Sequence, residues 1–276
     1  MLITVDELKS RLNDEHWVVL DCRFTLNQPD AGRRAYLEGH IPGAYYLDLE
    51  QDLSGPRRAH GGRHPLPDPE ELAEKLAAAG VTDGVRVVVY DAGGGMAQRA
   101  WWLIRYLGHD AVSVLDGGYP AWVAAGGSVT DALPEARPAA FTPRLRREWI
   151  ASVEEVAAVS KGERPGVLID ARAGARFRGE VEPIDRVAGH IPGARNAPWE
   201  EGVGPDGRWK AAEAQRDRFR FVQNPAEVIC YCGSGVTACA NLFAMALAGL
   251  EGARLYPGSW SDWISYPDNP VATGDA

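Results

Sequence analysis

Apolar and polar positions along the chain follow two periods, one typical of buried strands and one typical of helices. Short apolar runs at residues 85–90 and 112–115 indicate strands that are buried on both faces of a parallel sheet. Between them, residues 97–107 have the apolar spacing of a helix. Another helix is expected between Asp68, a suitable N-cap, and Gly80, a suitable end. This alternation predicts an α/β domain in which helices cover both faces of a parallel sheet.

The same pattern occurs twice along the chain. An apolar run that ends in Asp-x-Arg contains Asp21, and a second such run contains Asp170, 149 residues later. The hexapeptide Gly-His-Ile-Pro-Gly-Ala begins at Gly39 and again at Gly189, 150 residues later. The chain is therefore predicted to be a tandem duplication of one α/β domain.

The start of each copy and the connection between the copies are also visible. Thr4 and Ser152 each precede a glutamate by three residues, which is the pattern of a capping box at the start of a helix. The connecting segment contains three prolines and has no periodicity, as is typical of a linker. We predict an N-terminal domain over residues 1–132, a linker over 133–147 and a C-terminal domain over 148–276.

In the second copy a cysteine lies where a predicted strand meets a predicted helix. The apolar run 228–231 is followed by Cys232-Gly233-Ser234-Gly235-Val236-Thr237, and then by a helical pattern rich in alanine and leucine. The glycines let the backbone curve so that its N–H groups point inward, and the start of the helix adds partial positive charge. Such a loop stabilises an anion, so Cys232 should be available as a nucleophilic thiolate near neutral pH.

Composition narrows the classes of partner. A net charge of -9 and a pI near 5.2 argue against nucleic acid and anionic membranes, because both repel an acidic protein. The chain has no apolar run of ~18 residues and no signal-peptide pattern, so we expect a cytoplasmic protein. Cys22, Cys230 and Cys239 are expected to be reduced and to pack as small apolar residues. The cysteine spacing does not fit a zinc site, and neither a metal nor another cofactor is expected.

The repeated motifs and the six-residue cysteine loop resemble the two-domain rhodanese sulfurtransferases over essentially the whole chain. In that family only the C-terminal copy carries the working cysteine, and here the first copy has Asp91 at that position. An aspartate cannot form a persulfide, so the first copy should be inactive. The loop is uncharged, and in this it resembles the loop of the family branch that acts on 3-mercaptopyruvate. The resemblance implies that backbone N–H groups of the loop hold the substrate and the persulfide. The loop residues concerned are Gly233, Gly235, Val236 and Thr237. In the thiosulfate branch of the family, the corresponding loop instead has cationic side chains.

The resemblance also implies a proton relay of a serine, a histidine and an acid. Ser234 stands at the serine position and His64, in the first copy, at the histidine position. Glu50 stands at the acid position, where the family usually has an aspartate, and Asp48 and Asp52 are the alternatives. In such a relay the carboxylate orients the imidazole and sets its tautomer.

Two arginines before the second Gly-His-Ile-Pro-Gly-Ala motif are implied to bind the carboxylate of the substrate. Arg176 matches the first of them closely. Arg186 takes the second position only with a shift, because the segment before it is shorter than in the family. A guanidinium binds a carboxylate through two parallel hydrogen bonds. The alternative for both arginines is a surface ion pair with Asp170 or Glu182.

The resemblance implies sulfur transfer from a small-molecule donor, 3-mercaptopyruvate, to a thiol through a persulfide on Cys232. The acceptor would be a thioredoxin-like dithiol, or cyanide in the test tube, with ping-pong kinetics. Within the family the alternative is thiosulfate:cyanide sulfur transfer. A cysteine phosphatase would need an arginine at the end of the loop, where this chain has Val236, Thr237 and Ala238. A non-catalytic interaction module would not need Cys232.

Overall fold

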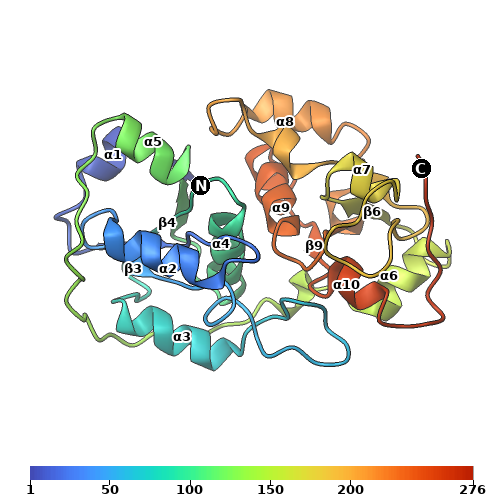
Figure 1. Ribbon diagram of the computed structural model, residues 1–276, viewed down its shortest axis with the longest axis horizontal. Helices are drawn as coiled ribbons and strands as arrows, with labels where there is room; N and C mark the ends of the chain where they lie inside the picture. Colours follow the sequence, from blue (N-terminus) through green and yellow to red (C-terminus); the bar gives the residue numbers. More distant parts are fainter. Residues whose placement is uncertain (276) are drawn as a thin grey trace. The chain divides into compact units, whose positions relative to one another are not determined.

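Two parallel β-sheets, one in each half of the chain, organise the fold in a computed structural model that describes residues 1–275 (Figure 1). Contacts between residues divide the chain into two compact units. The first unit contains Met1–Gly55, Leu66–Arg146 and Pro205–Arg208, and the second contains Pro56–Pro65, Arg147–Gly204 and the chain from Trp209 onward. Each unit is thus discontinuous in sequence. We refer to Pro56–Pro65 as the His64 segment.

The first unit contains a sheet of five parallel strands in the order β1-β5-β4-β2-β3. Its strands are β1 (Leu2–Ile3), β2 (Trp17–Asp21), β3 (Tyr45–Tyr46), β4 (Arg86–Tyr90) and β5 (Val112–Leu115). Helices flank the sheet: α1 (Val5–Lys9), α2 (Pro29–Glu38), α3 (Pro69–Ala78), α4 (Met96–Tyr106) and α5 (Gly118–Ala124). The central strand β4 is apolar from Val87 to Tyr90 and fully buried there, as expected for a parallel strand covered on both faces.

The second unit contains a sheet of four parallel strands in the order β7-β6-β8-β9. Its strands are β6 (Val167–Asp170), β7 (Arg195–Asn196), β8 (Val228–Tyr231) and β9 (Arg254–Leu255). Its helices are α6 (Val153–Ser160), α7 (Gly174–Phe177), α8 (Ala212–Arg218), α9 (Ala238–Leu247) and α10 (Ser259–Trp263), with 3-10 turns η1 (Arg147–Trp149), η2 (Trp199–Gly202) and η3 (Pro225–Glu227). Among the helices of residues 1–275, none is long and apolar enough to cross a membrane.

The two sheets share one strand order, which confirms the duplication. The order β5-β4-β2-β3 of the first unit matches β9-β8-β6-β7 of the second, with every pair parallel. The first unit adds β1 beside β5, and in the second unit a single parallel bridge between Ile150 and Leu255 occupies the equivalent place. The expected class, two α/β domains each with a parallel sheet between helices, is therefore correct.

The repeated motifs have a structural role in both units. Arg23 Nη2 donates to the Asp21 carboxylate and to the Gly39 carbonyl, both at 2.7 Å. Arg172 Nη2 makes the same two contacts with Asp170 and the Gly189 carbonyl, at 2.6 and 2.7 Å. In each copy the Asp-x-Arg motif thus ties the end of a strand to the start of the Gly-His-Ile-Pro-Gly-Ala motif, through buried charge-assisted hydrogen bonds.

Most of the predicted elements and caps are present. The strand predicted at 112–115 is β5, and the helix predicted at 97–107 is α4, which begins one residue earlier. The Asp68 carboxylate accepts hydrogen bonds from the N–H groups of the first turn of α3. Ser152 forms a complete capping box with Glu155. Thr4 accepts from the N–H of Glu7, but residues 1–275 show no return bond, so only half of that predicted box forms.

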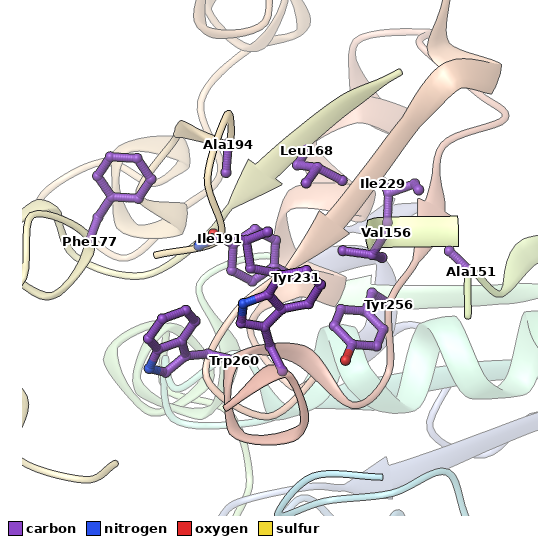
Figure 2. Close-up of a cluster of buried hydrophobic side chains, with 11 residues drawn as sticks. Ala151, Val156, Leu168, Phe177, Ile191, Ala194, Ile229, Tyr231, Tyr256 and Trp260 are labelled. Carbon is purple, nitrogen blue, oxygen red and sulfur yellow. Dashed lines mark hydrogen bonds between the residues drawn. The ribbon is translucent and has the colours of Figure 1, made fainter. Parts of the chain in front are cut away.

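A cluster of buried side chains supports the strand that leads into the cysteine loop (Figure 2). Tyr231, the last residue of β8, lies in this cluster with Ile229 of the same strand and Leu168 of β6. Trp260 of α10 is fully buried in it. Because Cys232 follows Tyr231 directly and α10 packs in the same cluster, the core holds both sides of the loop in place.

Candidate active site

The cysteine loop turns sharply between β8 and α9, and Gly235 makes the turn possible. Gly235 has φ +79°, in the left-handed region that favours glycine. A Cβ atom on Gly235 would lie 2.2 Å from the carbonyl oxygen of Pro257, so no other residue fits without rearrangement. In this conformation the N–H of Gly235 donates to Sγ of Cys232 at 3.2 Å. The loop thus directs a backbone donor at the sulfur, where it stabilises negative charge.

The start of α10 fixes the loop from the other side. The N–H of Cys232 donates to Oγ of Ser259 at 3.1 Å, and the N–H of Trp260 donates to the Cys232 carbonyl at 2.9 Å. The N–H of Ser261 donates to the Gly233 carbonyl at 3.0 Å. Ser259 has φ +55°, which is unusual for a residue with a side chain. These bonds hold the sulfur of Cys232 on a rigid backbone.

The end of the loop merges with the first turn of α9. The N–H of Cys239 donates to the Val236 carbonyl at 3.1 Å, and the N–H of Ala240 donates to the Thr237 carbonyl at 3.0 Å. Val236 is buried and Thr237 is partly exposed. Both residues contribute backbone geometry to the loop, and neither brings charge to it.

All four cysteines are free, and they differ in their surroundings. Burial raises the pKa of the Cys22 thiol well above its ordinary value, with the nearby Asp21 carboxylate adding to the effect. Burial also raises the pKa of the Cys230 thiol, with Cys239 and Cys232 nearby. A thiol that stays protonated is a poor nucleophile. Cys22 and Cys230 therefore fit the expected packing role.

In the first unit the equivalent loop holds a carboxylate in place of a thiol. Asp91 accepts hydrogen bonds from the N–H of Gly93 at 2.8 Å and the N–H of Ala97 at 3.0 Å. Burial raises the pKa of Asp91 above its ordinary value, while the loop N–H groups, led by that of Ala97, act in the opposite direction. The amide-lined loop of this copy thus binds its own carboxylate.

His64 lies beside Ser234 within the second unit. Nδ1 of His64 is 2.8 Å from Oγ of Ser234, two residues after Cys232, and both side chains are buried. The His64 segment belongs to the second unit although the residues on either side of it belong to the first. His64 and Ser234, the predicted relay residues from the two different copies, thus lie within hydrogen-bond distance of each other.

Several contacts attach the His64 segment to α10 and the residues after it. The N–H of Gly61 donates to the Asp262 carboxylate at 2.6 Å, and the N–H of Arg63 donates to Oγ of Ser261 at 3.1 Å. His60 stacks on Tyr266 with ring centroids 4.1 Å apart. Since α10 also binds the cysteine loop, one short helix sets the position of His64 relative to Cys232.

The three candidate relay acids lie in the first unit. Asp48 Oδ1 accepts from the N–H of Glu50 at 2.8 Å, and Asp52 accepts from the N–H of Asp48 at the same distance. Asp52 also pairs with Lys75 at 2.9 Å. All three acids line a pocket of about 290 Å³. The assignment of Glu50 to the relay stays a prediction, with Asp48 and Asp52 as alternatives.

Two guanidinium groups approach Gly233, and only one of them was expected. From the position of a Cβ atom built on Gly233, Nη2 of Arg63 would be 3.0 Å away and Nη2 of Arg176 would be 3.6 Å away. Arg186, the other arginine expected here, is exposed, and its Nη2 donates to the Ile264 carbonyl at 2.6 Å. Sequence reasoning missed Arg63, although it directly precedes His64 and is rigidly linked to it.

Several known proteins are similar to this chain in sequence and in fold. The Rhodanese-like domain family matches residues 4–125 and 152–266. A probable 3-mercaptopyruvate sulfurtransferase of Pseudomonas aeruginosa is 50% identical, covering 99% of this chain and 98% of the relative. SseB, a putative thiosulfate sulfurtransferase of Mycobacterium tuberculosis, is 40% identical, covering 100% and 98%. The solved structure of SseA, a 3-mercaptopyruvate sulfotransferase of Escherichia coli, superimposes with a TM-score of 0.82 at 34% identity, covering 94% of this chain and 98% of that one.

The chain belongs to the family of rhodanese-like proteins, with one such domain in each half. It is, more narrowly, an enzyme of sulfur transfer, in agreement with the names of its relatives. Those names divide over the donor, which is 3-mercaptopyruvate for the Pseudomonas protein and thiosulfate for the Mycobacterium protein. The names of the relatives therefore do not decide between the two sulfur donors.

Proposed function

We propose that this chain transfers the sulfur of 3-mercaptopyruvate to a thiol through a persulfide on Cys232. The Cys232 thiolate attacks the thiol sulfur of the donor, an S–S bond forms and the C–S bond breaks. The carbon takes the bonding electrons and leaves as the enolate of pyruvate, which then accepts a proton. An acceptor thiolate next attacks the outer sulfur, so that Cys232 returns to its thiolate form. No oxidant or reductant is consumed in either step.

The observation that carries this proposal is the contact between His64 and Ser234 beside Cys232. 3-Mercaptopyruvate brings a thiol proton, and its leaving enolate needs one, so this reaction benefits from a buried pair that moves protons. Thiosulfate has neither requirement, because sulfite leaves as a stable anion. The backbone N–H of Gly235 donates a hydrogen bond to the sulfur of Cys232, so it assists the reaction with either sulfur donor.

The test is a comparison of two donors. Sulfur transfer to cyanide is measured from 3-mercaptopyruvate and from thiosulfate, with Cys232→Ser as the blank. A higher kcat/KM for 3-mercaptopyruvate, with a persulfide on Cys232 detected by mass spectrometry, is expected. Full transfer activity in Cys232→Ser would overturn the proposal.

Thiosulfate transfer is the second candidate, and one observation favours it. Arg63 and Arg176 bring two guanidinium groups to Gly233, and cations suit a doubly charged donor. A kcat/KM that is higher for thiosulfate would favour this function over the first. Both reactions use Cys232 in the same way.

For the acceptor we propose a small thiol or a thioredoxin-like dithiol in the cytoplasm. Four free cysteines suit a reducing compartment. The net charge of -9 disfavours nucleic acid as a partner. Turnover of the persulfide enzyme by reduced thioredoxin, compared with glutathione and cyanide, tests this assignment.

A further inference from the structure

Asp262 of α10 is a buried residue whose two carboxylate oxygens hold two different parts of the second unit. It is 5% exposed. Its Oδ2 accepts a hydrogen bond from the Tyr256 hydroxyl, and its Oδ1 accepts one from the N–H of Gly61, both at 2.6 Å. Tyr256 lies in the core cluster that supports the cysteine loop (Figure 2), whereas Gly61 lies in the His64 segment. Asp262 therefore ties the His64 segment to the core.

The Tyr256 hydroxyl is a dependable donor in this contact. Burial raises the pKa of Tyr256 well above its ordinary value, and the nearby Asp262 carboxylate adds to the effect. The hydroxyl therefore keeps its proton near neutral pH and donates it to Asp262. A hydrogen bond to a carboxylate is shorter and stronger than one between neutral groups. The core thus fixes the orientation of the carboxylate that receives the N–H of Gly61.

The three residues before His64 all contact α10 or its first turn. Besides the bond from Gly61, the N–H of Arg63 donates to Oγ of Ser261 at 3.1 Å. Gly62 lies so close to the helix that a Cβ atom on it would be 2.4 Å from the carbonyl oxygen of Gly258. The backbone that leads into His64 is therefore fitted to this helix, and its position determines where the imidazole lies.

The first copy forms the same helix turn without the carboxylate. The register of the two sheets places equivalent residues of this part 141 positions apart. At that offset Ala121 corresponds to Asp262, and Leu115 corresponds to Tyr256. Ala121 and Asp262 each donate their N–H to the carbonyl of the glycine four residues earlier, at 3.2 and 3.1 Å. The turn therefore does not require a buried carboxylate, which is costly to keep in a fold.

We propose that Asp262 is a positioning residue that holds the imidazole of His64 against Ser234 for the reaction with the sulfur donor. This inference rests on the proposed function and adds to it the residue through which the core sets the relay. Asp262 acts through the backbone of Gly61. The contact of 2.8 Å between Nδ1 of His64 and Oγ of Ser234 is sensitive to small displacements, because hydrogen bonds weaken as the two atoms separate.

Asp262→Ala tests the positioning role, with Asp217→Ala as its matched control. The first variant introduces the side chain that the first copy has at this place, and Asp217 is an exposed residue of the same unit. We expect kcat for 3-mercaptopyruvate to fall roughly 10- to 100-fold in Asp262→Ala, because a charge-assisted contact is lost, with KM changing much less. Thiosulfate transfer should fall much less, since that donor does not need the relay. Equal losses with both donors, or an equal loss in Asp217→Ala, would overturn the proposal.

A second background shows whether Asp262 acts through His64. In His64→Ala, the further change Asp262→Ala should cost little more, because the group that it positions is already gone. A further loss as large as in the wild-type background would assign Asp262 to another role.

Asp262→Asn separates geometry from charge. The amide oxygen of asparagine can accept from the N–H of Gly61, and its NH2 group can donate to the Tyr256 hydroxyl, which also accepts. We therefore expect Asp262→Asn to lose much less mercaptopyruvate turnover than Asp262→Ala. Equal losses in the two variants would assign the effect to the charge and contradict a positioning role.

The imidazole signals of His64 separate this inference from the proposed function. The chain has six histidines, so a protein labelled with 15N at histidine gives few signals, and His64→Ala identifies those of His64. Ser234→Ala provides the signals of an imidazole that has lost its contact. Asp262→Ala should move the His64 signals toward those positions, and Asp217→Ala should leave them in place. Unchanged His64 signals in Asp262→Ala would reject the inference even if sulfur transfer from 3-mercaptopyruvate were demonstrated. Moved signals would support it even if the donor proved to be thiosulfate.

Discussion

Nδ1 of His64 lies 2.8 Å from Oγ of Ser234, although the two residues are 170 positions apart in the chain. Both side chains are buried, and Ser234 follows Cys232 by two residues. A hydrogen bond of this length between buried groups fixes the imidazole against the serine hydroxyl, in the same loop as Cys232. This pair is the part of the site that is best suited to moving protons.

Removing either member of this pair should slow turnover of 3-mercaptopyruvate. We expect His64→Ala and Ser234→Ala each to lower kcat/KM by about 10²- to 10³-fold, in the range of general acid–base catalysis. The double variant should lose little more, because the residues act as a unit. Steady-state kinetics with both donors provide the measurement. His64→Ala with unchanged mercaptopyruvate turnover would remove the proton-transfer role.

The sharp turn at Gly235 should not tolerate a side chain. Gly235→Ala would place Cβ 2.2 Å from the Pro257 carbonyl and force alanine into a positive φ, at a cost of about 1–3 kcal/mol or more. We expect the Gly235→Ala variant to form no persulfide on Cys232, as measured by mass spectrometry. Gly162→Ala is the control, because Gly162 also has a positive φ, +72°, but no atom lies within 4 Å of its Cβ position. Similar losses in both variants would mean that backbone strain alone explains the effect.

A cysteine in the first copy should not restore activity. Asp91→Cys in a Cys232→Ser background puts a thiol into an amide-lined loop, but Gly93 stands where the second copy has Ser234. We expect transfer from 3-mercaptopyruvate to cyanide to stay at the Cys232→Ser level. Asp91→Cys in the wild-type background shows whether the chain still folds. Recovered transfer in the double variant would mean that the amide-lined loop suffices without the serine.

The Arg176–Glu182 pair should make stability depend on pH in the acid range. Burial alone would raise the pKa of Glu182, but hydrogen bonds from Arg176 and from the N–H groups of Asp185 and Ile184 hold that pKa below its ordinary value. A carboxyl with a lowered pKa in the folded state stabilises the fold fully above its unfolded pKa, and the contribution disappears as pH falls through the folded pKa. Urea unfolding at pH 7 and at pH 3 should therefore show a smaller loss of stability in Glu182→Gln than in the wild type. Equal losses would show that the pair does not contribute.

Local pattern accounts for the parts of the structure that were predicted well. The strand β5 and the boundaries of α3 and α4 follow from apolar spacing and from caps such as Asp68, which act over a few residues. The repeated motifs revealed the duplication, and the shared strand order agrees with it. The position of Cys232 between β8 and α9 was likewise readable, because a strand, a glycine-rich turn and a helix follow one another directly.

Contacts over long sequence distances account for what was missed. The position of the Arg63 guanidinium beside the cysteine loop depends on its contact with Asp185, 122 residues away, and on the missing side chain of Gly233. Nothing in the local pattern around Arg63 signals these partners. The exchange of Pro56–Pro65 into the second unit has the same origin, since it depends on contacts with Asp262 and Ser261. The sequence located His64 and Ser234 only through the resemblance to a family, because no spacing rule connects them.

Because the second unit is discontinuous in sequence, the later repeat alone does not contain all of it. A shorter gene that encoded only the later repeat would keep Cys232 and lose His64, which lies in Pro56–Pro65. The earlier repeat, which has Asp91 where the later one has Cys232, therefore supplies ten residues to the compact unit that contains that cysteine. A cut in the linker would leave His64 and Ser234 on different fragments.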